Sequence, residues 1–244
     1  MRLALGWRVL LCATLGLVSP AIAQHSPFMQ QNPVVVELFT SQGCAACPPA
    51  DRLLDAMADR EDVIALALHV DYWDYIGWAD SFGQAQFSNR QKAYARAKGR
   101  SSVYTPQMII GGIDEVKGSS RPQVMGTLGT HLSLAVTPDP VRITLSGERG
   151  KDVVIEARAP EGLPYAADVL FLRYKDAEKV EILAGENAGR SVTYRNIVTS
   201  LQVLGTWNGL RPFRQTLPAE GPEAVVVIIQ EQGMGPIVGA ARRR

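Results

Sequence analysis

Apolar residues follow two different patterns along the chain. In the first part, apolar runs at residues 34–39 and 63–70 flank a segment, residues 50–57, whose apolar positions recur at helical spacing. This order of strand, helix and strand favours a parallel strand pair joined by a right-handed crossover, with the first strand buried in a mixed sheet. Further elements are expected in this part: a helix over residues 82–97, a hairpin at 108–110 and 114–117, and a helix over 122–134.

The pattern changes after residues 137–140, a Thr-Pro-Asp-Pro segment without periodicity that we interpret as a linker. Beyond it, short strands separated by turns predict an all-β domain at 141–244, most simply an antiparallel sandwich with its own core. The charged stretch at 190–195 is expected to be a solvated strand face, and the terminal arginines, 242–244, a solvated tail. The predicted strands are residues 141–145, 153–157, 167–174, 180–183, 191–202, 213–217 and 224–231.

The first residues have the pattern of a secretory signal. Arg2 and Arg8 precede an apolar stretch at residues 9–18, and Ala21-Ile22-Ala23 is a small-residue cleavage site. The stretch is shorter than the roughly 20 residues of a membrane span. We therefore expect a signal peptide at 1–23, a loosely ordered lead at 24–33, and a mature protein in the bacterial periplasm or outside the cell, with no membrane span after cleavage.

Composition and charge narrow the function classes. The 244 residues are 46% hydrophobic and 20% charged, as in globular proteins. The formal net charge of +1 falls to −1 without residues 1–23, which contain two arginines and no acid. Such a balance gives no reason to expect nucleic acid or an anionic membrane surface as a partner.

Two cysteines carry the strongest chemical signal. Cys44-Ala45-Ala46-Cys47 follows the first strand and precedes the first helix, and Cys12 is expected to leave with the signal peptide. A sulfur in the first turn of a helix lies in the positive end of the helix dipole, which lowers the pKa of its thiol. We expect Cys44 to be the exposed, reactive sulfur and Cys47 to resolve the mixed disulfide. A structural disulfide, a metal half-site or unrelated buried thiols are the alternatives.

Other residues are placed by the pattern near these cysteines. Glu37 interrupts the buried first strand, and is either a solvent-facing residue or a semi-buried carboxyl that exchanges a proton with Cys47. Thr105-Pro106 precedes a strand, where a cis peptide bond is expected. Aromatic residues after the second strand lie at the edge of the sheet where ligands bind, and either form a substrate-binding lip or cap a core. The aromatic candidates are Tyr72, Trp73 and Trp78.

Residues 34–134 resemble the thioredoxin superfamily in the strand, the CxxC pair, the helix and the Thr105-Pro106 step. The resemblance implies that the cis proline, Pro106, lies against the cysteines and that Thr105, with Tyr104 beside it, binds a peptide. It also implies that Glu37 is the buried acid of the central strand, one residue further from the first cysteine than usual. Gly43 stands where an aromatic residue is usual.

A second resemblance covers nearly the whole mature chain. Four segments are similar to a family of secreted bacterial proteins catalogued as domain of unknown function 1223. This resemblance implies a thioredoxin-like domain at 34–136 followed by a β-rich half. The segments are Glu37-Leu38-Phe39-Thr40-Ser41-Gln42-Gly43-Cys44, His69-Val70-Asp71-Tyr72-Trp73-Asp74, Tyr104-Thr105-Pro106-Gln107, and Ala188-Gly189-Arg190 leading to Arg195-Asn196-Ile197-Val198.

These observations favour a thiol–disulfide oxidoreductase that acts without a cofactor on protein or small-molecule thiols, together with a redox partner. One alternative is a copper or zinc protein using Cys44, Cys47 and His69, which requires a His69 ring nitrogen close to the sulfurs. Another is a binding module on an inert scaffold, which would leave both sulfurs buried, whereas a working pair would expose the first.

Overall fold

The computed structural model describes residues 32–134 and 141–244. The predicted signal peptide at 1–23, most of the lead at 24–33 and the linker at 137–140 lie outside these residues. Among the helices of the described residues, none has the length and apolar character needed to cross a membrane.

The first part forms a βαβ unit, a hairpin and two further helices. As predicted, β1 is parallel to β2, with Val34 opposite Val63, and β3 pairs antiparallel with β4. β1 lies between β2 and β3, and all of its residues are buried. The elements are β1 (Val34–Thr40), α1 (Pro48–Ala58), β2 (Val63–His69), the 3-10 helix η1 (Asp74–Ile76), α2 (Ala85–Ala97), β3 (Gln107–Ile110), β4 (Asp114–Lys117) and α3 (Arg121–Leu134).

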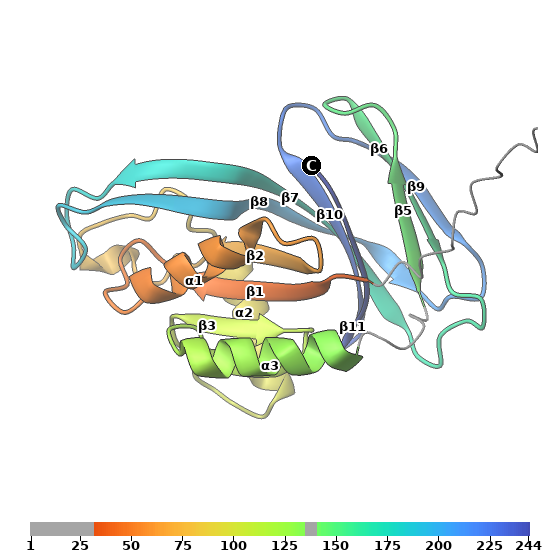
Figure 1. Ribbon diagram of the computed structural model, residues 1–244, viewed down its shortest axis with the longest axis horizontal. Coiled ribbons are helices and arrows are strands. Elements are labelled where there is room, and N and C mark those ends of the chain that lie inside the picture. The colour runs from red at the N-terminus through yellow and green to blue at the C-terminus, as the bar shows by residue number, and fades with distance from the viewer. Residues whose placement is uncertain (1–31, 135–140) are drawn as a thin grey trace, which may run out of the picture.

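The second part is all β, and its strands belong to two sheets. β5, β6 and β9 form a three-stranded sheet, whereas the others extend the sheet of the first part into eight strands in the order β11-β10-β7-β8-β2-β1-β3-β4 (Figure 1). The molecule is therefore mixed α/β with one large sheet and few helices. The elements are β5 (Arg142–Ser146), β6 (Asp152–Arg158), β7 (Ala167–Glu181), β8 (Ser191–Trp207), β9 (Phe213–Pro218), β10 (Ala224–Glu231) and β11 (Ile237–Arg243).

Two predictions about the strands are wrong. The strands predicted at 167–174 and 180–183 are one strand, β7, because pairing with β8 continues through the polar residues between them. β11 was not predicted, because only its first two residues, Ile237 and Val238, are strong β formers, and the glycine, alanines and arginines that follow have little β signal without the partner strand β10.

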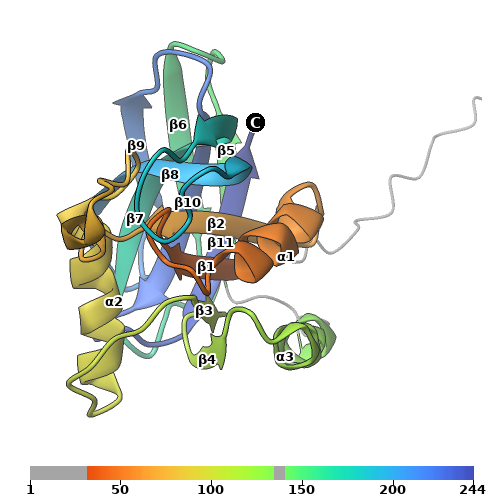
Figure 2. The same cartoon turned by 90° about the vertical axis from the view of Figure 1, so that its left-hand side faces the viewer.

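Helices cover both faces of the large sheet where its strands come from the first part of the chain. α1 and α3 lie on one face, where Leu54 and Val124 pack on β1, and α2 lies on the other (Figure 2). The core on the α2 face also contains Leu172 of β7 and Val226 of β10. The two parts thus share a core, where the sequence predicts a separate one for each. The domain division at 137–140 remains a prediction.

The two parts join where β8 meets β2. Their parallel pairing is short, with Ala67 opposite Ile197. The preceding residue, Asn196, is buried with φ of 48°, a left-handed conformation that asparagine tolerates better than most residues. Its Nδ2 donates to the carbonyl of Ala65, at 2.8 Å, and to that of Ala58, at 3.3 Å. This side chain therefore ties β8 to both β2 and the end of α1.

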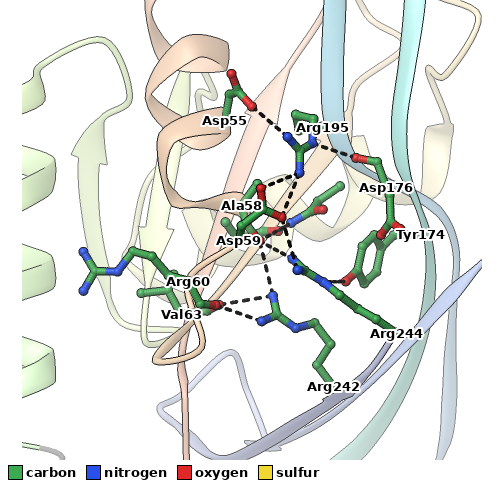
Figure 3. A network of polar contacts seen from close by, with 12 residues as sticks. Asp55, Ala58, Asp59, Arg60, Val63, Tyr174, Asp176, Arg195, Arg242 and Arg244 are labelled. Atoms are coloured by element: carbon green, nitrogen blue, oxygen red, sulfur yellow. Dashed lines mark hydrogen bonds and ion pairs between the residues drawn. The ribbon is translucent and has the colours of Figure 1, made fainter.

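Arginines from the second part satisfy the C-terminal end of α1, whose last turn has no basic residue of its own (Figure 3). Arg242 donates to the carbonyls of Ala58 and Arg60, at 3.4 and 2.8 Å, and Arg244 also donates to Ala58. Arg195 bonds Asp59 at 2.9 Å and lowers the pKa of its carboxyl. The last carbonyls of a helix lack intrahelical partners and attract cations. The predictions of a solvated face at 190–195 and a solvated tail at 242–244 are wrong for these side chains.

Removing these contacts should destabilise the whole fold. We expect the double variant Arg242→Ala/Arg244→Ala to lose about 2 kcal/mol of unfolding free energy, because charge-assisted bonds to helix carbonyls are lost. Urea denaturation at neutral pH measures the change. Arg149→Ala is the matched control, since this exposed side chain has no hydrogen bond or ion pair within the described residues. Equal midpoints for the double variant and the control would contradict the role of these arginines.

Candidate functional site

Cys44 and Cys47 form a disulfide between the end of β1 and the start of α1, with their Cα atoms 5.4 Å apart. Two successive turns carry the chain there: the Cys44 amide donates to Ser41 and the Cys47 amide to Cys44. Cys47 is the N-cap of α1, so Cys44 lies three residues before it. The sequence predicts both cysteines in the first helical turn. Because the dipole acts mainly within that turn, it favours negative charge at Cys47 more than at Cys44.

Both cysteines are buried, with exposed fractions of 1% for Cys44 and 0% for Cys47. The expectation that Cys44 is exposed is therefore wrong for the disulfide form. Asn187, from the loop between β7 and β8, covers the cysteine turn and donates to the carbonyls of Gln42 and Cys44, at 2.8 and 2.9 Å. The second part of the chain thus closes over the cysteines of the first.

The aromatic segment packs on the residue before Cys44. A Cβ atom at Gly43 would lie 3.1 Å from Cδ1 of Ile76 and 3.3 Å from Cβ of Trp73. Such contacts are tighter than ordinary van der Waals packing, so a side chain at this position would push the segment away. An aromatic side chain, which the superfamily resemblance would lead one to expect at this position, would not fit beneath this segment.

The Thr105–Pro106 peptide bond is cis, as predicted. The indole nitrogen of Trp73 donates to Oγ1 of Thr105 at 2.7 Å, which links the aromatic segment to this turn. Pro106 lies close to α1, because a Cβ placed on Gly118 would be 3.2 Å from Cβ atoms of both Ala50 and Pro106. The cysteine pair, the cis proline turn and the aromatic segment therefore lie together near the carboxyl ends of β1 and β2.

The remaining aromatic candidates form hydrogen bonds with other residues of the same chain. Trp78 donates to Oε1 of Gln42 at 2.8 Å. Tyr72 donates to Gln91 at 3.0 Å, and burial raises the pKa of its hydroxyl to about 12. Gln91 in turn donates to the carbonyl of Tyr104, at 2.8 Å. Among these residues Tyr104 remains 39% exposed, so it is the one best placed to meet a partner.

Glu37 does not lie on the cysteine face. Strand residues alternate between faces, and Glu37 shares its face with Val35 and Phe39, which pack towards α2. Its carboxylate accepts from Nε of Arg90, at 2.6 Å, and from the Tyr94 hydroxyl, at 2.6 Å. Its expected proton exchange with Cys47 is thus not supported by its position. It serves instead as one half of a buried ion pair.

A different buried carboxyl occupies the cysteine face. Asp51 follows Cys47 by four residues, which places both on the same side of α1. Its Oδ1 accepts from Thr40 at 2.8 Å, and its buried Oδ2 has no partner among the described residues. Burial raises the pKa of Asp51 to about 6, although nearby His69 acts to lower it. Asp51 is therefore a group that can gain or lose a proton near neutral pH.

His69 continues this buried cluster. Its Nδ1 lies 2.8 Å from Oδ2 of Asp80, and both side chains are fully buried. Burial acts to raise the pKa of Asp80, but His69 and backbone donors hold it below its usual range. The ring packs against Tyr194, with centroids 4.9 Å apart, and its Nε2 has no partner among the described residues. The sequence offered two signals for the cluster: polar residues at the ends of β1 and β2, and an acid one turn after Cys47.

The described residues do not bring together three or more His, Cys, Asp and Glu side chains in a group that could hold a metal ion. In particular, His69 directs its Nδ1 at Asp80. The predicted metal alternative with Cys44, Cys47 and His69 has no such geometry in its favour.

Comparison with known proteins decides the family. The family described as protein of unknown function (DUF1223) matches residues 35–230, which include the cysteines and the Asn187 loop. The chain belongs to the DUF1223 family. The resemblance drawn from the sequence is thereby confirmed.

One solved structure is similar over most of this DUF1223 chain. It is a crystal structure of a protein from Agrobacterium tumefaciens, 34% identical, with a TM-score of 0.71, covering 86% of this chain and 92% of that one. A second, from Bacteroides fragilis, is 14% identical over 43% of this chain and 15% of that one, and its TM-score of 0.16 supports no argument. The comparison with curated proteins found no match.

Asp51 should make the stability of this DUF1223 protein depend on pH. A carboxyl whose pKa rises from 3.8 to about 6 on folding favours the fold when protonated, and this contribution disappears as the pH rises through 6. Between pH 4 and pH 8, we expect the free energy of unfolding of Asp51→Asn to rise by about 3 kcal/mol relative to that of the wild type. Urea denaturation at several pH values measures this difference. If the unfolding free energies of the two proteins changed in parallel with pH, burial would not raise the pKa of Asp51.

Asn187 should control access to the disulfide. Asn187→Ala removes the two hydrogen bonds that hold the loop on the cysteine turn, so we expect dithiothreitol to reduce the disulfide several-fold faster. The rate of reduction is measured by quenching the reaction at set times, labelling the free thiols and counting the labels by mass spectrometry. Glu186→Ala, an exposed change in the same loop, is the control and should react like the wild type. Unchanged rates in both variants would mean that Asn187 does not limit access.

Proposed function

We propose that this DUF1223 protein is a thiol–disulfide oxidoreductase with Cys44 and Cys47 as its redox pair. The observation that carries the proposal is a buried carboxyl with a raised pKa, Asp51, on the same face of α1 as one member of a CxxC disulfide. A structural disulfide has no need of such a group, because it exchanges no proton. A reducible disulfide can use one, since a buried carboxyl can donate a proton to the thiolate that leaves.

The proposed reaction proceeds in two steps. A substrate thiolate attacks the sulfur of Cys44, the S–S bond breaks, and Cys47 leaves as a thiolate that takes a proton from Asp51. A second substrate thiolate then attacks the mixed disulfide, releasing an oxidised substrate disulfide and the Cys44 thiolate. Two electrons pass from two substrate thiols to the protein, and the reverse sequence oxidises the dithiol form.

The surrounding arrangement supports a thioredoxin-like interpretation of the first part. The βαβ unit, the hairpin after a cis proline and the final helix follow the order that the resemblance implies. In this proposal Pro106 borders the redox pair, while Thr105 and Tyr104 meet the bound substrate. The Thr105 hydroxyl accepts a hydrogen bond from the Trp73 indole. In this proposal the backbone of the turn, rather than this side chain, recognises the substrate.

Catalysis by this pair requires a movement. The cysteines are covered by the Asn187 loop and the aromatic segment, so one of these must shift before a substrate reaches the sulfur. The Asn187 loop is held to the cysteine turn by one side chain with two hydrogen bonds. Its displacement is the less costly opening. The predicted export from the cytoplasm, part of the same proposal, would place the protein where disulfides persist.

The burial of both sulfurs favours a second candidate function. In this alternative the disulfide is structural, and the protein is a binding module with a thioredoxin-like scaffold. An inert scaffold predicts cysteines without solvent access, which agrees with exposed fractions of 1% and 0%. The two candidates differ in the potential at which the disulfide is reduced.

A redox titration in glutathione buffers separates them. We expect reversible two-electron reduction of Cys44–Cys47 with a midpoint between about −270 and −120 mV, the range of proteins that exchange disulfides. Alkylation of free thiols followed by mass spectrometry measures the reduced fraction. Cys44→Ser and Cys47→Ser controls should show no such transition. A midpoint below about −300 mV would assign the structural role instead.

A further inference from the structure

A surface pocket of about 380 Å³ opens beside the N-terminal end of α1. α1 contributes Pro48, which directly follows Cys47, together with Asp51 and Arg52, and the start of β8 contributes Ser191 and Thr193 on the opposite side. The pocket therefore lies between the helix that carries Cys47 and the hairpin that covers the disulfide.

Two arginines line this pocket without serving the fold. The side chains of Arg52 and Arg190 have no hydrogen bond or ion pair with any described residue. By contrast, Asp55, the exposed acid of the same pocket, is paired with Arg195 at 3.2 Å. The pocket thus presents two guanidinium groups without a bonded partner. Its exposed carboxylate, Asp55, is engaged by Arg195, and its buried carboxyl, Asp51, accepts from Thr40 and interacts with Arg52 only through space. Guanidinium groups bind carboxylates in a bidentate manner.

The buried acid of the site reaches the same pocket. Asp51 is buried, lines the pocket, and has an Oδ2 atom without a partner among the described residues. The helix end itself offers little to an anion, because Pro48 and Pro49 remove the first two backbone N–H groups. Recognition of a negative group there must come from the arginine side chains.

We propose that this pocket binds the carboxylate of a small thiol compound, which is the substrate of the redox pair. The inference rests on the proposed function and adds its substrate class. Arg52 and Arg190 hold the carboxylate, and the thiolate of the same molecule attacks the disulfide. The released Cys47 thiolate takes the proton of Asp51, and a second molecule of the thiol completes the reduction, leaving as the substrate disulfide.

The position of Arg190 connects binding with access. Its backbone N–H donates to the carbonyl of Asn187 at 3.2 Å, so both residues belong to one turn of the hairpin. A carboxylate held by Arg190 therefore contacts the turn that covers Cys44. Binding and opening involve the same few residues.

Three thiols of similar size and different charge test the proposal. The probes are 3-mercaptopropionate, 2-mercaptoethanol and cysteamine, compared at equal thiolate concentrations and low ionic strength, and each rate is divided by the rate at which the same thiol reduces a small neutral disulfide, because thiolate nucleophilicity rises with the pKa of the thiol. We expect the normalised rate of the anionic thiol to be about 5-fold higher than that of the neutral one, as two partly exposed ion pairs allow, and that of the cationic thiol to be lowest. In Arg52→Gln/Arg190→Gln the three normalised rates should become equal.

The matched control is Arg149→Gln/Arg211→Gln, which changes the net charge equally with two arginines outside the pocket. It should keep the wild-type preference. Rates independent of thiol charge in the wild type, or the same loss of preference in the control, would overturn the inference while leaving the redox function intact.

A non-reacting ligand tests the pocket independently of any chemistry. S-methylglutathione has carboxylates but no free thiol, and it should shift backbone NMR signals of residues 190–193 in the wild type and not in Arg52→Gln/Arg190→Gln. If no thiol reduces the disulfide, the proposed function fails, and this measurement still decides whether the pocket binds carboxylates. Absence of these NMR shifts in the wild type would show that the pocket does not bind carboxylates.

Discussion

The pairing of β8 with β2 is the contact on which the rest of the structure depends. It is short, and Asn196 secures it by bonding the backbone of both β2 and α1 from a left-handed conformation. Because β8 is fixed there, the β7–β8 hairpin extends over the first part and brings Asn187 to the cysteine turn. The candidate site is therefore made by both parts of the chain, although both of its cysteines belong to the first.

Buried charge is distributed over the two faces of the sheet in different ways. On the α2 face, Glu37 and Arg90 neutralise each other, and the Tyr94 hydroxyl donates to Glu37 and accepts from Arg90. On the α1 face, Asp51 has no cation bonded to it, and burial raises the pKa of its carboxyl. A closed ion pair contributes to specificity of packing, whereas an unpaired acid keeps its capacity to exchange protons. The two faces thus differ in their buried carboxyls: Glu37 is closed in an ion pair, whereas Asp51 has no bonded cation.

Local patterns in the sequence were sufficient for much of the first part. They predicted β1, α1, the β3–β4 hairpin and the cis bond before Pro106, because each depends on neighbouring residues. Contacts between distant residues were missed. Nothing near Asn187 or Arg242 in the sequence indicates that these side chains bind the cysteine turn and α1. Glu37 is a buried acid on β1, as the resemblance implies, but its expected proton exchange with Cys47 depended on which face of β1 meets α1, and the sequence does not show that.

The continuity of the large sheet limits how this protein can be divided. A fragment containing only the first part would expose the β2 edge that β8 covers, and a fragment of the second part would expose β8 along the same line. Unprotected strand edges recruit other chains and lead to aggregation. The apolar side chains of β7 and β10 that complete the core on the α2 face would also be absent. Expression of either part alone is thus expected to yield insoluble material rather than a folded module.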